Sequence, residues 1–153
     1  MERLRPLHGI WRGRGRGCYP TIEPFEYEEN LRFELDIRYP MIHYEQRTFL
    51  TPSGDASHWE SGFIRRVDDA FEVSSAQDSG RVEVLRGTLN TSGDALRLDL
   101  DSVVLAHDPR LVRTRRRITL QGGVLRYVKW MATHTTSLPE LLQHLEAELR
   151  QEG

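Results

Sequence analysis

The feature that most constrains the fold is a two-residue alternation of apolar and charged side chains. In Leu31–Tyr39 the odd positions are apolar and the even positions are charged, until Pro40 ends the run. In Ala95–Leu105, three leucines alternate with Arg97, Asp99 and Asp101. Successive side chains of a strand point to opposite faces, so each run predicts a strand with one apolar face and one solvated face.

Similar runs recur about every ten residues and are separated by turn-forming residues. Pro20–Pro24 and Glu26–Asn30 are interpreted as a connecting turn after the first run. The other predicted strands are Gly9–Tyr19, Met41–Leu50, Ser57–Val67, Phe71–Gln77, Arg81–Asn90, Leu111–Leu120 and Val124–Ala132. One-sided alternation without a long helix to cover a sheet favours closure. We therefore predict an all-β fold: a single domain over residues 1–153, an antiparallel up-and-down β-barrel of about ten strands with a ligand cavity.

The C-terminal segment, residues 137–150, is ambiguous by pattern alone. Leu138, Leu141, Leu142, Leu145 and Leu149 fit a helical stripe, and the composition favours a helix. However, Leu145, Ala147 and Leu149 also alternate with charged residues, as in a strand that closes the barrel. On propensity alone the segment would be assigned as helix.

The first run is unusual because glycines occupy one of its faces. Gly9, Trp11, Gly13, Gly15 and Gly17 share that face, and Arg12, Arg14 and Arg16 lie on the other. Glycine weakens a strand, so several on one face indicate a sharp bend or a close approach by another part of the structure or a ligand. A phosphate-binding loop is not indicated, because no Gly-Lys-Ser/Thr and no helix follow.

Composition excludes several classes of protein. A net charge of −2 gives no general attraction to nucleic acid or to an anionic membrane. Cys18 is the single cysteine, so an internal disulfide and a cysteine-based metal cluster are excluded. Met1–His8 has no apolar signal-peptide region, and no apolar run has transmembrane length. These observations predict a cytoplasmic protein without nucleic-acid or membrane partners, and they leave its oligomeric state open between monomer and weak dimer.

Motifs for catalysis by the protein itself are not found. The six histidines include no pair at metalloprotease spacing, and no Gly-x-Ser-x-Gly elbow would place a nucleophilic serine. Cys18 is interpreted as a surface thiol. In the cluster Arg113–Arg117, three arginines share a strand face and are expected to pair with Asp99 and Asp101 rather than with phosphates. From the residues alone, the chain is predicted to be a carrier of an apolar or amphipathic ligand in an apolar interior.

Several blocks of the sequence, taken together, resemble the nitrobindins, a family of haem-binding β-barrels similar in shape to fatty-acid-binding proteins and lipocalins. The first block is Gly9-x-Trp11-x-Gly13-x-Gly15 running on to Tyr19-Pro-Thr21-Ile22. The others are Ser57–Phe63, Ala76–Gly80, Leu125–Ala132 and the final His144-Leu-x-Ala-x-Leu149. The blocks occur in order and span nearly the whole chain.

This resemblance implies a set of site residues. His144 matches the axial ligand to haem iron, bound as a neutral imidazole with the sixth iron position open. Thr21 matches a position beside the haem, His58 and Gln77 match positions on the distal side of the cavity, and Met131 matches one near the pocket. The glycine face would leave room for the macrocycle, and the tail from His144 onward would be a strand.

Two features depart from the family pattern. Residues 132–143 are two more than usual between Met131 and His144, a difference that affects where the histidine lies. Lys129 takes a place where an apolar residue is expected, and it would either reach a haem propionate or extend to the rim.

The function implied by the resemblance is that of a haem b protein that isomerises peroxynitrite to nitrate and binds nitric oxide. The cofactor would supply the chemistry, and the protein would supply the axial ligand, burial and access. Two rival interpretations remain at this point. A haem-free carrier of fatty acids or other apolar ligands would not depend on His144, and a purely structural module would have a filled interior.

Overall fold

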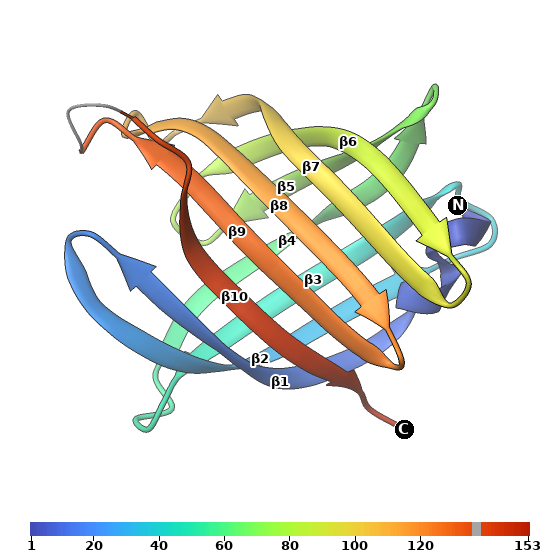
Figure 1. Cartoon of the computed structure of the whole chain (residues 1–153), viewed down its shortest axis with the longest axis horizontal. Coiled ribbons are helices and arrows are strands. Elements are labelled where there is room, and N and C mark those ends of the chain that lie inside the picture. Colours follow the sequence, from blue (N-terminus) through green and yellow to red (C-terminus); the bar gives the residue numbers. More distant parts are fainter. Residues whose placement is uncertain (136–138) are drawn as a thin grey trace.

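Within the described residues, 1–135 and 139–153, ten strands close into an antiparallel barrel in the computed structural model (Figure 1). Each strand pairs with its neighbours in sequence, and β1 pairs with β10 to complete the ring. The predicted up-and-down barrel of about ten strands is confirmed. The strands are β1 (Gly9–Tyr19), β2 (Ile22–Leu35), β3 (Met41–Leu50), β4 (Ala56–Val67), β5 (Ala70–Gln77), β6 (Val82–Ser92), β7 (Ala95–Ala106), β8 (Leu111–Gln121), β9 (Val124–Thr133) and β10 (Leu142–Gln151).

Strand β2 corrects two boundaries expected from the sequence. The residues interpreted as a turn, Pro20–Pro24 and Glu26–Asn30, mostly belong to β2, which pairs with β1 as far as Ile22 opposite Tyr19. At its other end β2 stops at Leu35, and the side chains of Ile37 and Tyr39 are exposed. Pairing with β1 therefore decides the length of β2, and the alternation that continues beyond it has no strand to support it.

The C-terminal segment forms strand β10, so the helix favoured by propensity is wrong and the strand implied by the family resemblance is confirmed. It pairs with β1 on one side and β9 on the other. Two ladders of hydrogen bonds and burial of Ala147 and Leu149 outweigh the helical preference of its residues. Ser137, the first residue of this segment, and Leu138 of the proposed helical stripe lie outside the described residues.

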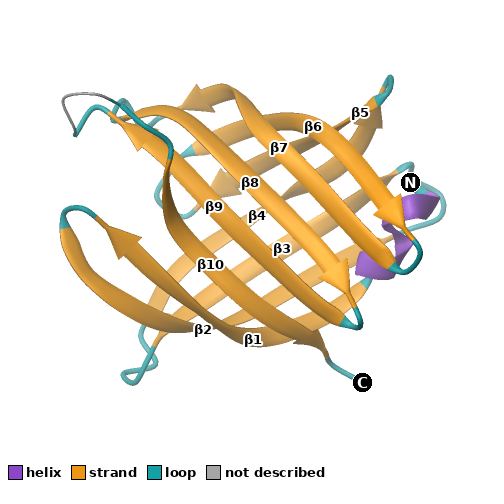
Figure 2. Cartoon of the chain, in the orientation of Figure 1, coloured by secondary structure: helices purple, strands orange, loops and turns teal. Residues whose placement is uncertain are grey.

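One end of the barrel is closed by a short N-terminal 3-10 helix, η1 (Glu2–Leu7), coloured purple in Figure 2. The side chains of Leu4 and Leu7 are completely buried. The indole Nε1 of Trp11 donates to the carbonyl of Leu7 at 2.8 Å, which fixes the helix against β1. The start of β10, the strand that carries His144, and the tip of the β1–β2 hairpin lie at the opposite end, which we call the open end (Figure 1).

The glycine face of β1 points inward, and its glycines allow close approach. A Cβ at Gly13 would overlap the carbonyl of Glu148 on the neighbouring strand β10. At Gly15 and Gly17 the space is filled by the rings of Tyr27 and Phe25. The expectation that this face leaves room for a macrocycle is therefore wrong, because aromatic rings of β2 occupy the room.

The outer face carries the predicted ladder of opposite charges. Arg117 lies opposite Asp99 in the register of β7 and β8, with an Nε–Oδ1 distance of 2.6 Å. Arg113 and Arg115 both pair with Asp101, at 2.6 and 3.1 Å. This cluster is thus neutralised by its own sheet, as expected. Among the helical residues that the structure describes, none forms a segment long and apolar enough to span a bilayer.

Candidate functional site

His144 lies near the start of β10, where the strand is irregular. Gln143 pairs with Trp130 and Leu145 with Lys129, so the register shifts across His144 as in a β-bulge. A bulge turns a side chain out of its regular alternation, and such bulges are common beside functional sites. The side chain is nevertheless buried, with 4% of its surface exposed.

The two ring nitrogens of His144 have different surroundings. Nδ1 lies 2.7 Å from the backbone carbonyl of Leu142. A carbonyl oxygen only accepts hydrogen bonds, so Nδ1 carries the hydrogen and Nε2 presents its lone pair. The ring of Tyr19 packs against the imidazole, with centroids 4.9 Å apart. This tautomer, fixed by a backbone hydrogen bond, is the one that binds a metal through Nε2.

The two extra residues between Met131 and His144 do not displace the strand. Leu142 pairs directly with Met131, so the added length lies in the connection before β10. Residues 136–138 of that connection are outside the described part of the chain.

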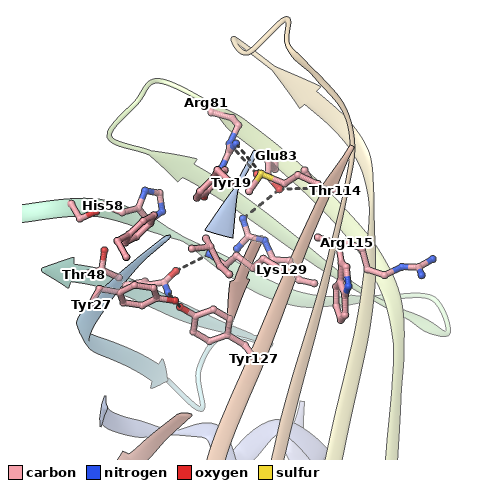
Figure 3. A pocket seen from close by; sticks show the side chains of 17 residues that line it. Tyr19, Tyr27, Thr48, His58, Arg81, Glu83, Thr114, Arg115, Tyr127 and Lys129 are labelled. Atoms are coloured by element: carbon pink, nitrogen blue, oxygen red, sulfur yellow. Dashed lines mark hydrogen bonds and ion pairs between the residues drawn. The ribbon is translucent and has the colours of Figure 1, made fainter. Parts of the chain in front are cut away.

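Two hollows lie at the open end and share part of their walls. An outer groove of about 580 Å³ is bordered by His144, by Cys18 of β1 and by Pro24 of β2. An inner cavity of about 150 Å³ is bordered by Tyr19, His58 and Met131 (Figure 3). Phe25 and Leu145 border both hollows and so form part of the wall between them.

The side chains expected from the family resemblance are only partly brought together. His58 and Met131 line the inner cavity, whereas Thr21 is exposed in the β1–β2 turn. Gln77 is buried, and its amide donates to Glu83 at 3.0 Å. His144 borders the groove, on the other side of Tyr19 from the cavity.

The inner cavity is charged, which corrects the expectation of an apolar interior. Arg116 of β8 donates to Glu60 of β4 at 2.5 Å, and Lys129 of β9 donates to the other oxygen of the same carboxylate at 3.1 Å. Burial alone would raise the pKa of Glu60, but the charges of Arg116 and Lys129 hold it well below its usual range. Lys129 therefore does not provide the apolar surface expected at this position, and it does not extend to the rim. It is bound inside the barrel.

A second carboxylate extends this arrangement toward the rim of the cavity. Glu83 lies 3.4 Å from Nη2 of Arg116 and 3.1 Å from Nε of Arg81, and it accepts a hydrogen bond from Thr114 at 3.0 Å. Burial raises the pKa of Glu83, and the two arginines more than offset this and lower it. Nη1 of Arg81 is 3.8 Å from the sulfur of Met131, so its guanidinium sits at the cavity edge.

The third carboxylate, Glu29 of β2, differs from the other two. It accepts hydrogen bonds from Tyr127 at 2.5 Å and from Gln46 at 2.7 Å, and no cation of the described residues forms an ion pair with it. Burial raises the pKa of Glu29 to about 7, because these hydrogen bonds and the more distant Lys129 offset only part of the desolvation. Gln46 connects Glu29 to Lys129, whose Nζ donates to its amide oxygen at 2.9 Å.

We call Arg81, Arg116, Lys129, Glu29, Glu60 and Glu83 the interior charge cluster. The sequence analysis did not single out most of these residues, although the strand alternation carried a signal. Arg116 shares parity with Thr114 and Ile118, and Glu29 shares parity with Tyr27 and Leu31, so both belong to inward faces. What the alternation lacks is the partner of each charge, which comes from another strand.

Comparison with known proteins shows which family the chain resembles. Residues 1–151 match the model of the THAP4-like, heme-binding beta-barrel domain. A peroxynitrite isomerase of Arabidopsis thaliana is 40% identical over 147 residues, covering 95% of this chain and 85% of that protein. Peroxynitrite isomerase 1 of Rhodococcus jostii is 37% identical, covering 97% and 82%. The crystal structure of Rv2717c from M. tuberculosis superposes with a TM-score of 0.87 at 31% identity, covering 100% of this chain and 99% of that one.

Proposed function

The chain belongs to the THAP4-like haem-binding β-barrel domain family, with haem as its cofactor, and from this premise we propose that it binds haem b through His144 and isomerises peroxynitrite to nitrate. The relatives named above support the activity, since they are peroxynitrite isomerases that align with most of this chain. Binding of nitric oxide by the ferrous form is part of the same proposal. The exposed free thiol of Cys18 supports a reducing compartment such as the cytoplasm.

The observation that carries the proposal is the state of the His144 ring. Its Nδ1 is committed to the Leu142 carbonyl, so the neutral ring has its lone pair on Nε2, the nitrogen through which a histidine binds haem iron. The neighbouring Tyr19, Phe25 and Leu145 offer aromatic and apolar surface of the kind that packs against a porphyrin. The donor and its surroundings therefore fit the cofactor.

When bound, haem would supply the chemistry that converts peroxynitrite to nitrate. The residues of this chain have other tasks. His144 would hold the iron, and Tyr19 and Phe25, which lie beside it, would limit the access of water. Arg81, which lines the cavity near Met131, supplies positive charge and hydrogen-bond donors that attract an anion. The ring nitrogens of His58, which also lines the cavity, lie 3.1 Å from Glu60 and 3.4 Å from Asp78. An isomerisation needs no net proton transfer, which agrees with a site without a catalytic acid or base.

The alternative of a haem-free carrier of apolar ligands is less compatible with this interior. A second hollow, between Leu31, Phe33 and Ile64, measures only about 40 Å³ and also borders Glu60, Arg116 and Lys129. The larger inner cavity is bordered by Arg81, Arg116 and Lys129. A long acyl chain would have to displace paired charges, at a cost that burial of methylene groups does not offset.

The proposal is tested by titrating the apoprotein with hemin and following the Soret band. We expect saturable one-to-one binding with a histidine-ligated ferric spectrum that is lost in His144→Ala. His134→Ala is the matched control, because His134 is an exposed histidine in the turn after β9. Nitrate yield from peroxynitrite, measured on the loaded proteins, should follow haem occupancy. Uptake that is unsaturable, or equal in His144→Ala and His134→Ala, would overturn the assignment.

A further inference from the structure

The walls of the inner cavity are unequal in charge. Of the interior charge cluster, the three cations Arg81, Arg116 and Lys129 border the cavity, but Glu83 is the only one of its three carboxylates to do so (Figure 3). Glu60 and Glu29 lie behind the cavity wall, where they hold Arg116, Lys129 and Gln46 in place. The cavity is thus lined mainly by positive charge, and carboxylates outside its wall fix these cations in position.

The same walls carry neutral hydrogen-bond donors. Of the hydroxyl groups of Thr48, Thr114, Tyr27 and Tyr127, which border the cavity, those of Thr114 and Tyr127 donate to Glu83 and Glu29, and that of Tyr27 lies 2.7 Å from the hydroxyl of Tyr127. Among these four described residues, this leaves the hydroxyl of Thr48 to donate to a ligand. Lys129 has three N–H donors, and two of them are directed to Gln46 and Glu60. With a volume of about 150 Å³, the cavity exceeds several times the roughly 30 Å³ that one water takes in the liquid. It has room for an ion of three or four heavy atoms with some of its hydrating waters.

We propose that this cavity is a binding site for a small oxyanion, of the class of nitrate, nitrite or a carboxylate group, held by Lys129, Arg81 and the hydroxyl of Thr48. The oxygens of such an ion accept charge-assisted hydrogen bonds, which are the strong ones in a site of low dielectric. The site concerns the cavity of the apoprotein, so it stands whether or not the haem chemistry proposed above is correct.

The state of Glu29 supports the same assignment. With its pKa raised by burial to about 7, Glu29 is largely neutral under mildly acidic conditions, and the cluster then has three positive charges against two negative. The groups that face Glu29 are Tyr27 on its own strand, Gln46, Glu60, Tyr127 and Lys129. An anion in the cavity would balance the excess charge, and ionisation of Glu29 at higher pH would oppose it.

The test is a nitrate titration of the haem-free protein at constant ionic strength, with chloride as the balancing anion, observed through the three tryptophan indole signals in NMR. Trp130 borders the cavity, whereas Trp11 is buried near the closed end and serves as an internal control. We expect a saturable shift of the Trp130 signal and none of the Trp11 signal. A Trp130 shift that is absent or grows linearly without saturation would overturn the proposal.

Variants locate the site. Lys129→Met should weaken nitrate binding roughly tenfold or more, since it removes a charge-assisted contact. Arg115→Gln is the matched control: it also removes one positive charge at the cavity border, but the guanidinium of Arg115 points away and pairs with Asp101 (Figure 3). If Lys129→Met does not fold, Arg81→Gln at the cavity edge gives the same test. Equal losses in Arg81→Gln and Arg115→Gln would refute a specific site.

Two further arms define the occupant. Binding should be several-fold stronger at pH 6 than at pH 8, and Glu29→Gln should remove this difference. His58 borders the same cavity, so a pH dependence that persists in Glu29→Gln would come from another group and would count against the role of Glu29. Calorimetry of nitrate with the hemin-loaded protein separates two sources of the oxyanion. Retained binding identifies a free ion, and lost binding identifies a carboxylate of haem itself; either result upholds the site.

Discussion

The closed end and the open end of the barrel are built from the same strands but are filled by different kinds of side chain. At the closed end, Leu4, Leu7 and Trp11 fill the interior with apolar side chains that are at most 1% exposed. Toward the open end the interior charge cluster takes their place, with Arg116 and Glu60 almost as deeply buried. Apolar contacts stabilise the fold without direction, whereas buried charges stabilise only the geometry in which each one has its partners.

The comparison indicates that the closed end mainly stabilises the fold, whereas the open end carries the candidate site. Replacing a buried ion pair by apolar side chains is often neutral or stabilising, so the interior charge cluster is not required to hold the barrel together. Arg81, Arg116, Lys129 and Glu83 of this cluster instead border the cavity, next to the groove that His144 lines. We infer that the closed end supplies the rigidity on which the charged site at the open end depends.

The largest effect is expected from Trp11→Ala at the closed end. This change removes a side chain that is 1% exposed and breaks its hydrogen bond to Leu7, so it should lower the free energy of unfolding by about 3–5 kcal/mol. Urea unfolding followed by circular dichroism measures it. Val103→Ala, at an exposed position of β7, is the control and should change the same quantity by about 0.5 kcal/mol or less. A loss below 1 kcal/mol for Trp11→Ala would show that the helix and Trp11 do not anchor the barrel.

Next comes Arg116→Met, which leaves Glu60 and Glu83 buried with fewer partners. We expect a loss of about 3 kcal/mol, because the cost is that of an uncompensated buried charge. The double variant Arg116→Met with Glu60→Leu should recover part of this loss, since both members of the pair are then neutral. Strictly additive losses in the double variant would contradict the division of roles between the two ends.

An intermediate effect concerns pH and Glu29. Its pKa in the folded protein, about 7, lies above the ordinary value of 4.5, so the folded state holds this proton more tightly than the unfolded state does. The stability that Glu29 contributes is complete below about pH 4.5 and is lost as the pH rises through about 7. Between pH 4 and 8, the wild-type protein should therefore lose about 2–4 kcal/mol relative to Glu29→Gln. Parallel stability curves for the two proteins would mean that Glu29 has an ordinary pKa.

The smallest effect is expected on the outer face, in the ladder formed by the same residue types. Arg117→Gln breaks the ion pair with Asp99, and both side chains of this pair are about a third exposed. Solvent screens such pairs, so the loss should be about 0.5 kcal/mol, and it should shrink further in 0.5 M salt. A loss as large as that of Arg116→Met would remove the distinction between the charged interior and the charged surface.

Much of the fold could be predicted because the side chains of a strand alternate between the interior and the solvent, so the sequence pattern shows which residues face each side. Leu96, Leu98 and Leu100 form a buried face, as their alternation with charged residues predicts, and Arg117 pairs with Asp99 as expected. The family blocks, with His144 in the last of them, were also visible in the sequence. The roles of His144, His58, Gln77, Thr21 and Met131 toward haem remain predictions.

The sequence by itself determined the strands, their inner and outer faces, the meander and the family, because these follow from local alternation and from motifs of neighbouring residues. The alternation alone left the tail open between helix and strand, and the tertiary structure decided for the strand that the family resemblance implied, since its two ladders form with β1 and β9. Only the tertiary structure decided the character of the cavity. Arg116, Glu60 and Lys129 lie on three different strands, and a buried charge is tolerated only where closure of the barrel brings its partners within hydrogen-bond distance.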